Sequence, residues 1–189
     1  TFVSCILSAY GCSSKNKNKN HSEQNTEENT MSKVYFTREI SPESLMQIYQ
    51  ALGREAKGNN VAIKVSTGEP GGKNFLQPAL ISNLVQSVQG TIIECNTAYG
   101  GNRASTGRQL KGARDRGLMD MANVDIMEAE GETDLPVTGG THITRDIGGK
   151  NFLNYDFTVI LSHFKGHAMA GFGGASKNMS IGIASANGK

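Results

Sequence analysis

Near-continuous apolar runs that alternate with amphipathic helices constrain the fold of this chain more than any other feature. The runs cover residues 61–65, 91–95 and 157–161. Strands that read as continuous apolar runs are typically buried on both faces of a sheet. Because helical segments separate them, the pattern predicts an α/β fold in which a mostly parallel sheet carries helices on both faces, a Rossmann-like arrangement.

Helix signals give the boundaries of the intervening segments. Pro42 follows Ser41, a good N-cap, and apolar residues then recur at helical spacing until Gly53 or Gly58. A second helix is predicted from Pro78 to Gly90, and a more polar one over 108–116. The remaining predicted elements are strands at 33–37 and 124–127, a small hairpin from 135–137 and 141–144, and a last helix over about 174–185.

Polar side chains follow several of the predicted strands. In a parallel sheet, the loops after the strand C-termini meet at one edge, where ligands bind. We therefore expect the loops after 61–65, 91–95 and 157–161 to form one site. Its predicted catalytic residues are His163, Lys165 and His167, and its predicted ligand-binding or cofactor-binding residues are Ser66, Thr67, Glu69, Asn96, Gly171, Gly173, Gly174 and Lys177.

The two histidines favour function over a purely structural role. Imidazole titrates near neutral pH, which suits a general acid or base and also a metal ligand. A lone histidine often only caps a strand end, but here His163 and His167 accompany Lys165 and Lys177. The glycines between 171 and 174 precede a predicted helix and could present backbone N–H groups to an anion, although their spacing matches neither the dinucleotide fingerprint nor the P-loop.

Composition excludes several classes of protein. The formal net charge is only +2, without a basic stripe with interleaved aromatic residues, so nucleic acid is not an expected partner. The three cysteines do not make a disulfide framework, and they are too few for an iron–sulfur cluster held by four thiolates of this chain.

The N-terminal residues resemble a targeting signal rather than part of the folded domain. Residues 1–11 are apolar and end in small residues before Cys12, as in the signal of a bacterial lipoprotein with Cys12 as the lipidated residue. Residues 13–32 are almost wholly polar and predict a disordered tether. These features predict a lipid-anchored protein of the cell envelope, with the lipid at Cys12 as its only membrane contact. The alternative is that Met31 is the true start and the protein is cytoplasmic.

Four stretches of the chain carry a resemblance to a known family. They are Ser66-Thr-Gly-Glu-Pro-Gly-Gly72 with Asn74-Phe75, Glu94-Cys-Asn-Thr-Ala-Tyr-Gly-Gly101, Val124-Asp-Ile-Met127, and the segment from Ser162 to Asn178. From Met31 onward the chain resembles the uncharacterised iron–sulfur-centre proteins of the domain-of-unknown-function 362 family. Members usually continue into a cysteine-rich segment with 4Fe-4S clusters. The resemblance implies such a cluster in the full-length protein, on residues beyond this chain, which we expect to be truncated at its C-terminus.

The segment from His167 to Lys177 also resembles, more distantly, the nickel-dependent lactate racemase family. There the histidine is catalytic and the lysine tethers a nickel pincer nucleotide. The resemblance implies an acid/base role for His167 and a cofactor or phosphate contact for Lys177. Gly173 replaces a serine of that family, and no clear counterpart of its further nickel-ligating histidine is found here. The resemblance therefore does not imply that this chain binds nickel or the nucleotide cofactor.

Three functions are compatible with these patterns. The first is redox or metal-assisted chemistry on a small anionic ligand, with an electron-transfer partner. The second is a racemase-like or isomerase-like transfer of a proton or hydride next to a carboxylate. The third is a lipoprotein that binds a small ligand without catalysis. We expect the first.

Overall fold

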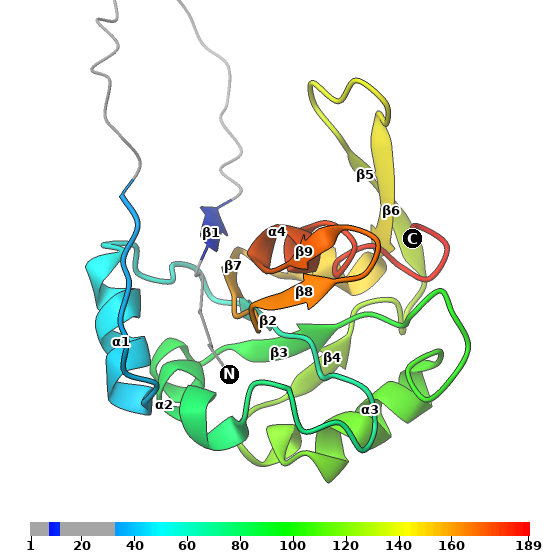
Figure 1. The fold of residues 1–189 in the computed structure, drawn as a ribbon. Helices are drawn as coiled ribbons and strands as arrows, with labels where there is room; N and C mark the ends of the chain where they lie inside the picture. The colour runs from blue at the N-terminus through cyan, green and yellow to red at the C-terminus, as the bar shows by residue number, and fades with distance from the viewer. Residues whose placement is uncertain (1–7, 12–32) are drawn as a thin grey trace, which may run out of the picture.

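A computed structural model describes residues 8–11 and 33–189 and has a five-stranded central sheet in the order β1-β7-β2-β3-β4 (Figure 1). Four of its strands are parallel: β2 (Val61–Lys64), β3 (Thr91–Glu94), β4 (Val124–Ile126) and β7 (Phe157–Ile160). The fifth, β1 (Ser8–Gly11), runs antiparallel to β7 at the sheet edge. The predicted mostly parallel α/β sheet is confirmed.

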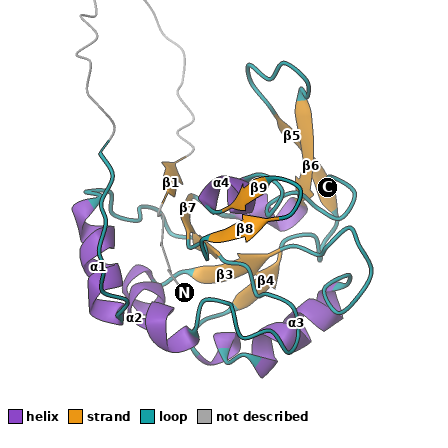
Figure 2. Ribbon diagram, viewed as in Figure 1, coloured by secondary structure: helices purple, strands orange, loops and turns teal. Residues whose placement is uncertain are grey.

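Both faces of the sheet are covered, as Figure 2 shows. The helices α1 (Pro42–Ala51), α2 (Pro78–Val88) and α3 (Thr106–Asp115) lie on one face. Their apolar residues join Ile63, Ile92 and Val159 in the larger core. The other face carries the 3-10 helix η2 (Lys150–Asn154), the short helix α4 (Ala175–Met179) and the segment around Ile183. A shorter 3-10 helix, η1 (Leu118–Asp120), follows α3.

The predicted helix boundaries are confirmed for α1 and α2 by their local chemistry. The Ser41 side chain accepts from the backbone N–H of Ser44, and the Ser44 side chain accepts in return from the backbone of Ser41, so two orphan donors are satisfied. Helix α2 ends at Gln89, which is left-handed, just before Gly90. A Cβ at Gly90 would lie 2.7 Å from the Ile63 side chain, so only glycine allows α2 to return this close to β2.

The strand order creates a switch point. From β2 the chain steps to β3 and β4 in one direction, and β7 then adds to the other side of β2. In open α/β sheets, the crevice outside the carboxyl ends of two such strands is where ligands bind. The topology therefore places the candidate site between the loop after β2 and the segment after β7.

Two predicted elements are wrong. Residues 33–37 form no strand, and Val34 and Phe36 are 87% and 73% exposed. The last helix ends at Met179 rather than near Ser185, because Ile183 and Ala184 turn back into the second core and Ala184 pairs with Gly148. Burial of these residues against the sheet outweighs continuation of the helix.

The hairpins also differ from the prediction. The predicted small hairpin exists, but its strands are β5 (Glu132–Pro136) and β6 (Arg145–Gly149), so the second strand begins one residue after the predicted 141–144. A further hairpin of β8 (Lys165–His167) and β9 (Gly171–Gly173) follows β7 and was not predicted from the sequence. It carries two of the three predicted catalytic residues.

The predicted tether and the predicted lipidation site, Cys12, lie outside the described residues and stay predictions. Strand β1 lies within the predicted signal segment. Cleavage before Cys12 or a start at Met31 would each leave the mature protein without β1, and the edge of β7 would then lack this strand partner. Within residues 8–11 and 33–189, no helix is long and apolar enough to cross a membrane.

Candidate functional site

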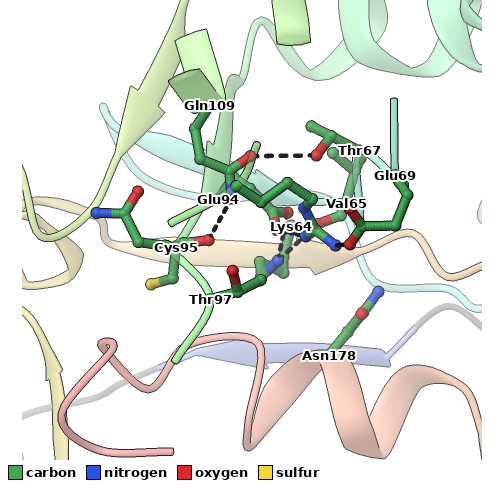
Figure 3. A network of polar contacts seen from close by, with 12 residues as sticks. Lys64, Val65, Thr67, Glu69, Glu94, Cys95, Thr97, Gln109 and Asn178 are labelled. Atoms are coloured by element: carbon green, nitrogen blue, oxygen red, sulfur yellow. Dashed lines mark hydrogen bonds and ion pairs between the residues drawn. The ribbon is translucent and has the colours of Figure 1, made fainter. Parts of the chain in front are cut away.

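A buried ion pair joins the last residues of the two central strands. The Lys64 ammonium lies 2.8 Å from a carboxylate oxygen of Glu94, and their side chains are 1% and 4% exposed (Figure 3). Lys64 also donates to the Val65 carbonyl. Lys64 and Glu94 each end an otherwise apolar strand, and they can be buried because the two charges pair with each other.

Arg103, in the loop after β3, connects this buried pair to residues nearer the surface. Arg103 donates to the second Glu94 oxygen at 2.7 Å and lies 3.4 Å from Glu69 in the loop after β2. The Tyr99 hydroxyl also donates to Glu69, at 3.1 Å. Glu94 is therefore held by two cations, while Glu69 ties the two loops together at the rim of the site.

Neutral side chains fix the same two loops to α3, as Figure 3 shows. The hydroxyl of Thr67 donates to the Gln109 side chain at 3.3 Å, and Gln109 donates to the carbonyl of Cys95 at 2.6 Å. Thr67 and Gln109 are both fully buried. The predicted site residue Thr67 thus positions the loop after β2 through α3, and Ser66 lies beside it, half-buried.

On the β7 side, the short helix α4 is attached directly to the strand end. The Asn178 amide donates to the Ser162 hydroxyl at 2.7 Å and to the Leu161 carbonyl at 3.4 Å. This anchor holds α4, and with it Lys177, against the end of β7. Neither Ser162 nor Asn178 was among the predicted binding residues.

The hairpin β8–β9 presents Lys165 and His167 on the same face. The two residues are two apart in a strand, and Gly173 lies opposite Lys165. A Cβ built on Gly173 would lie 3.8 Å from Lys165 Cγ and 3.9 Å from His167 Cβ. Gly173 therefore lies at van der Waals distance from both side chains.

Positive charges gather at this edge. The pKa of Lys165 is lowered, first by burial and then by the nearby Lys177 and Arg103. Glu94 acts on Lys165 in the opposite direction but is already paired with Lys64 and Arg103. The segments after β2, β3 and β7 thus meet at one edge of the sheet with cations in excess of carboxylates.

The two predicted histidines are placed differently. The Nδ1 of His167 accepts from the backbone N–H of Ala170 at 3.1 Å. The Nδ1 of His163 is buried without a hydrogen-bond partner, and its imidazole lines a cavity of about 420 Å³ together with Lys73, Phe75 and Leu76.

The pKa of His163 is lowered, first by burial and then by Lys165. The chain is extended over β8, so His163 and His167 are not one helical turn apart on a common helix.

The remaining predicted binding residues occupy separate places. Gly171 and Gly173 belong to β9, and Gly174 directly precedes α4. Asn96 is buried, and its backbone carbonyl accepts from the Lys189 ammonium while its side-chain oxygen has no partner.

The described residues offer no ready metal centre. Within residues 8–11 and 33–189, no group of three or more His, Cys, Asp or Glu side chains is placed to hold a metal. Cys95 is buried and its thiol donates to the Ile183 carbonyl at 3.2 Å. Burial raises the pKa of Cys95 to about 12, so its thiol is protonated at neutral pH. Asp125 accepts from Asn151 and Tyr155 and is used for packing.

Comparison with protein families places this site in a known context. The model of the family described as a domain of unknown function, DUF362, matches residues 61–189. The chain belongs to the DUF362 family. Neither the curated proteins nor the solved structures include a match to it. The matched range contains all of β2 to α4 and therefore every residue of the site described above.

Sequence reasoning did not select the centre of the site. Lys64 and Glu94 lie inside runs that were interpreted as buried strands, and Arg103 was one of several polar residues in its loop. A usable signal was present, because each of the two strands ends in a charged residue and the two charges are opposite. Such a pair at the carboxyl ends of neighbouring parallel strands predicts a buried ion pair at the ligand-binding edge.

Proposed function

We propose that this DUF362 domain binds a small anionic molecule at the edge where β2, β3 and β7 end, and that redox or metal-assisted chemistry takes place on it. The observation that carries the proposal is that Lys177 and Arg103 both act on Lys165 as like charges, beside the Glu94 carboxylate that already pairs with Lys64 and Arg103. A carboxylate or phosphate group placed among these cations would relieve their repulsion.

Three features of the site support an anion in particular. The cations come from different segments, so the fold brings like charges together at a cost that a ligand can offset. The site lies at the switch point beside β2, where α/β sheets bind ligands. The Asn178–Ser162 hydrogen bond and the Thr67–Gln109 contact hold the surrounding loops in place, which lowers the ordering cost of binding.

The electron source of this proposal is a 4Fe-4S cluster in the full-length protein. The chain itself does not fit such a cluster, because it has only three cysteines and Cys95 is a buried, protonated thiol. The cluster would therefore be held by residues outside these 189, or by an electron-transfer partner. The residues described here would bind and orient the anionic substrate.

A second candidate, proton transfer next to a carboxylate, is favoured by the hydrogen bond of His167. A neutral imidazole that accepts at Nδ1 carries its proton on Nε2. His167 lies on the same hairpin face as Lys165, so its Nε2–H can donate a hydrogen bond to a ligand held by the lysine and orient that ligand for proton transfer. His167→Gln should then abolish turnover and leave anion binding intact. Unchanged turnover would reject this candidate.

Binding is tested by titrating the chain with oxalate and with inorganic phosphate, followed by isothermal calorimetry. Replacement of Lys165 or Lys177 by Gln should weaken binding of the preferred anion about tenfold or more, as expected for a lost charged contact. Lys57→Gln, at the opposite end of β2, is the matched control. Equal affinities for the wild type and both site variants would overturn the proposed anion site.

The redox part needs a separate measurement. Iron and acid-labile sulfide are determined in the complete natural protein after anaerobic purification. Stoichiometric iron and sulfide support the proposal, and their absence would end it. A chain that binds the anion without iron and without turnover would instead be a ligand-binding protein, the third function considered above.

We also propose that Cys12 carries a lipid anchor and that the protein lies at the cell envelope. Mass spectrometry of the N-terminal peptide tests this directly. Diacylglycerol on Cys12 is the expected result, and an N-terminus at Met31 would place the protein in the cytoplasm instead.

A further inference from the structure

A second cavity, of about 570 Å³, lies between the loop after β2 and helix α3. Its lining includes Gly71, Gly72 and Phe75 from the loop and Arg108, Lys111 and Arg116 from the helix. It contains none of the residues Lys165, His167 or Lys177. We propose that this cavity binds a small molecule through a diphosphate group, at a site separate from the anion site at the end of β7.

Three cations line the cavity in a row along α3 and its C-cap, Arg116. Arg108, Lys111 and Arg116 follow one another at spacings of three and five residues, and Gly112 and Asp115 lie between them on the same lining. At about 1.5 Å per residue, the row spans about 12 Å along the helix. Three cations face one carboxylate, Asp115, which is paired with Lys111 at 2.5 Å. A row this long suits an extended polyanion better than a single compact anion.

One of the cations is held in place. Arg116 donates to the Gly112 carbonyl at 2.9 Å and to the Gly68 carbonyl at 3.2 Å, and its guanidinium lies 5.3 Å from the centre of the Phe75 ring. A Cβ at Gly112 would lie only 3.1 Å from Arg116 Nη1. The guanidinium therefore bridges the loop and the helix and forms a fixed positive wall of the cavity.

The other two cations keep free capacity. Arg108 uses one guanidinium nitrogen to donate to the Gly101 carbonyl at 3.0 Å, and a guanidinium has five N–H donors. Among the described residues, Lys111 is bonded only to the exposed Asp115, and a phosphate can compete with this carboxylate for it. Both side chains can turn toward one ligand, and Arg matches phosphate oxygens in bidentate geometry.

The facing loop leaves space for such a ligand. Gly71 has a left-handed backbone with φ of +77°, and a Cβ built on it would meet nothing within 4 Å. Without side chains, Gly71 and Gly72 let a phosphate approach the backbone closely. The cavity volume lies within the range of ordinary small-molecule sites.

The experiment is calorimetric titration of the full chain with inorganic pyrophosphate, and with inorganic phosphate as the shorter anion. The test variant is Arg108→Gln with Lys111→Gln. The matched control is Arg114→Gln, an exposed arginine of α3 that does not line the cavity. Lys165→Gln with Lys177→Gln serves as the control for the other site.

Pyrophosphate should bind more tightly than phosphate. The test variant should weaken pyrophosphate binding about 10- to 100-fold, as expected for the loss of two charged contacts. Arg114→Gln and the double variant of Lys165 and Lys177 should bind pyrophosphate as the wild type does.

Three results would overturn the inference: no pyrophosphate binding at millimolar concentration, an equal loss in Arg114→Gln, or a loss confined to the variant of Lys165 and Lys177. The last of these would leave the proposed anion site standing, so the two proposals fail separately.

Discussion

Removal of the Glu94 charge is the sharpest test of the buried ion network. In Glu94→Gln, the Lys64 ammonium loses its counter-charge and keeps neutral acceptors, the Val65 carbonyl and the new amide oxygen, while its side chain remains 1% exposed. Loss of one partner of a buried pair costs about 3–5 kcal/mol, because a charge is left without compensation. For a chain of this size, that corresponds to a fall of about 6–20 °C in Tm.

The reciprocal change should cost less. In Lys64→Met, the Glu94 carboxylate still accepts from Arg103 at 2.7 Å, so no buried charge is left alone. We expect a loss of about 1–3 kcal/mol for this variant. The double variant of Lys64→Met and Glu94→Gln should be more stable than Glu94→Gln, because the lone ammonium is then absent.

Urea unfolding of the wild type, both single variants and the double variant forms a double-mutant cycle for this pair. Glu130→Gln, at an exposed carboxylate, is the control and should stay within about 0.5 kcal/mol of the wild type. The reasoning is refuted if Glu94→Gln costs under about 1 kcal/mol, or if the two single effects simply add in the double variant.

Three further predictions follow from single sites. Because burial raises the pKa of Cys95 to about 12, its thiol should react with a thiol reagent at neutral pH only after unfolding, and fast reaction in the folded chain would show an accessible thiolate. Burial and Lys165 lower the pKa of His163 from 6.5, so the unfolded state binds the proton first as the pH falls. The free energy of unfolding, measured in urea, should therefore fall less between about pH 8 and about pH 5 in His163→Gln than in the wild type. Equal losses in the two proteins would contradict the assignment. Gly90→Ala should cost about 1–3 kcal/mol in urea unfolding because its Cβ would meet Ile63, whereas Gly107→Ala, with nothing within 4 Å, should cost far less.

The loops that were predicted to form one site do meet at one edge of the sheet, but the charged residues at the strand ends there were not predicted. Loops after parallel strands meet at one edge for geometric reasons, so residues around 66–69, 96–103 and 162–167 could be grouped from chain order alone. Lys64 and Glu94 were missed because each is a single charged residue in a run whose apolar residues predict a buried strand. Only the register of β2 beside β3 brings Lys64 and Glu94 together.

The structure of the segment after β7 could also not be predicted from the sequence alone. No strand was predicted for this segment, but residues 165–167 are extended and pair with β9. The many glycines weaken any local preference, and the hairpin forms where Phe164 packs on Phe172 with ring centres 4.9 Å apart. The direction in which His163 and Lys165 point therefore depends on pairing between residues that are not adjacent in sequence.

By itself the sequence determined the buried strands, the start of α1 and the end of α2, and the resemblance to the family that the match over 61–189 confirms. These features depend on local dihedral preferences and on the period of apolar residues. Tertiary structure alone decided that β7 lies beside β2, that Glu94 is shared by Lys64 and Arg103, and that Lys177 lies near enough to lower the pKa of Lys165. The physical reason is that strand order and charge pairing are set by packing between distant segments, which no local pattern records.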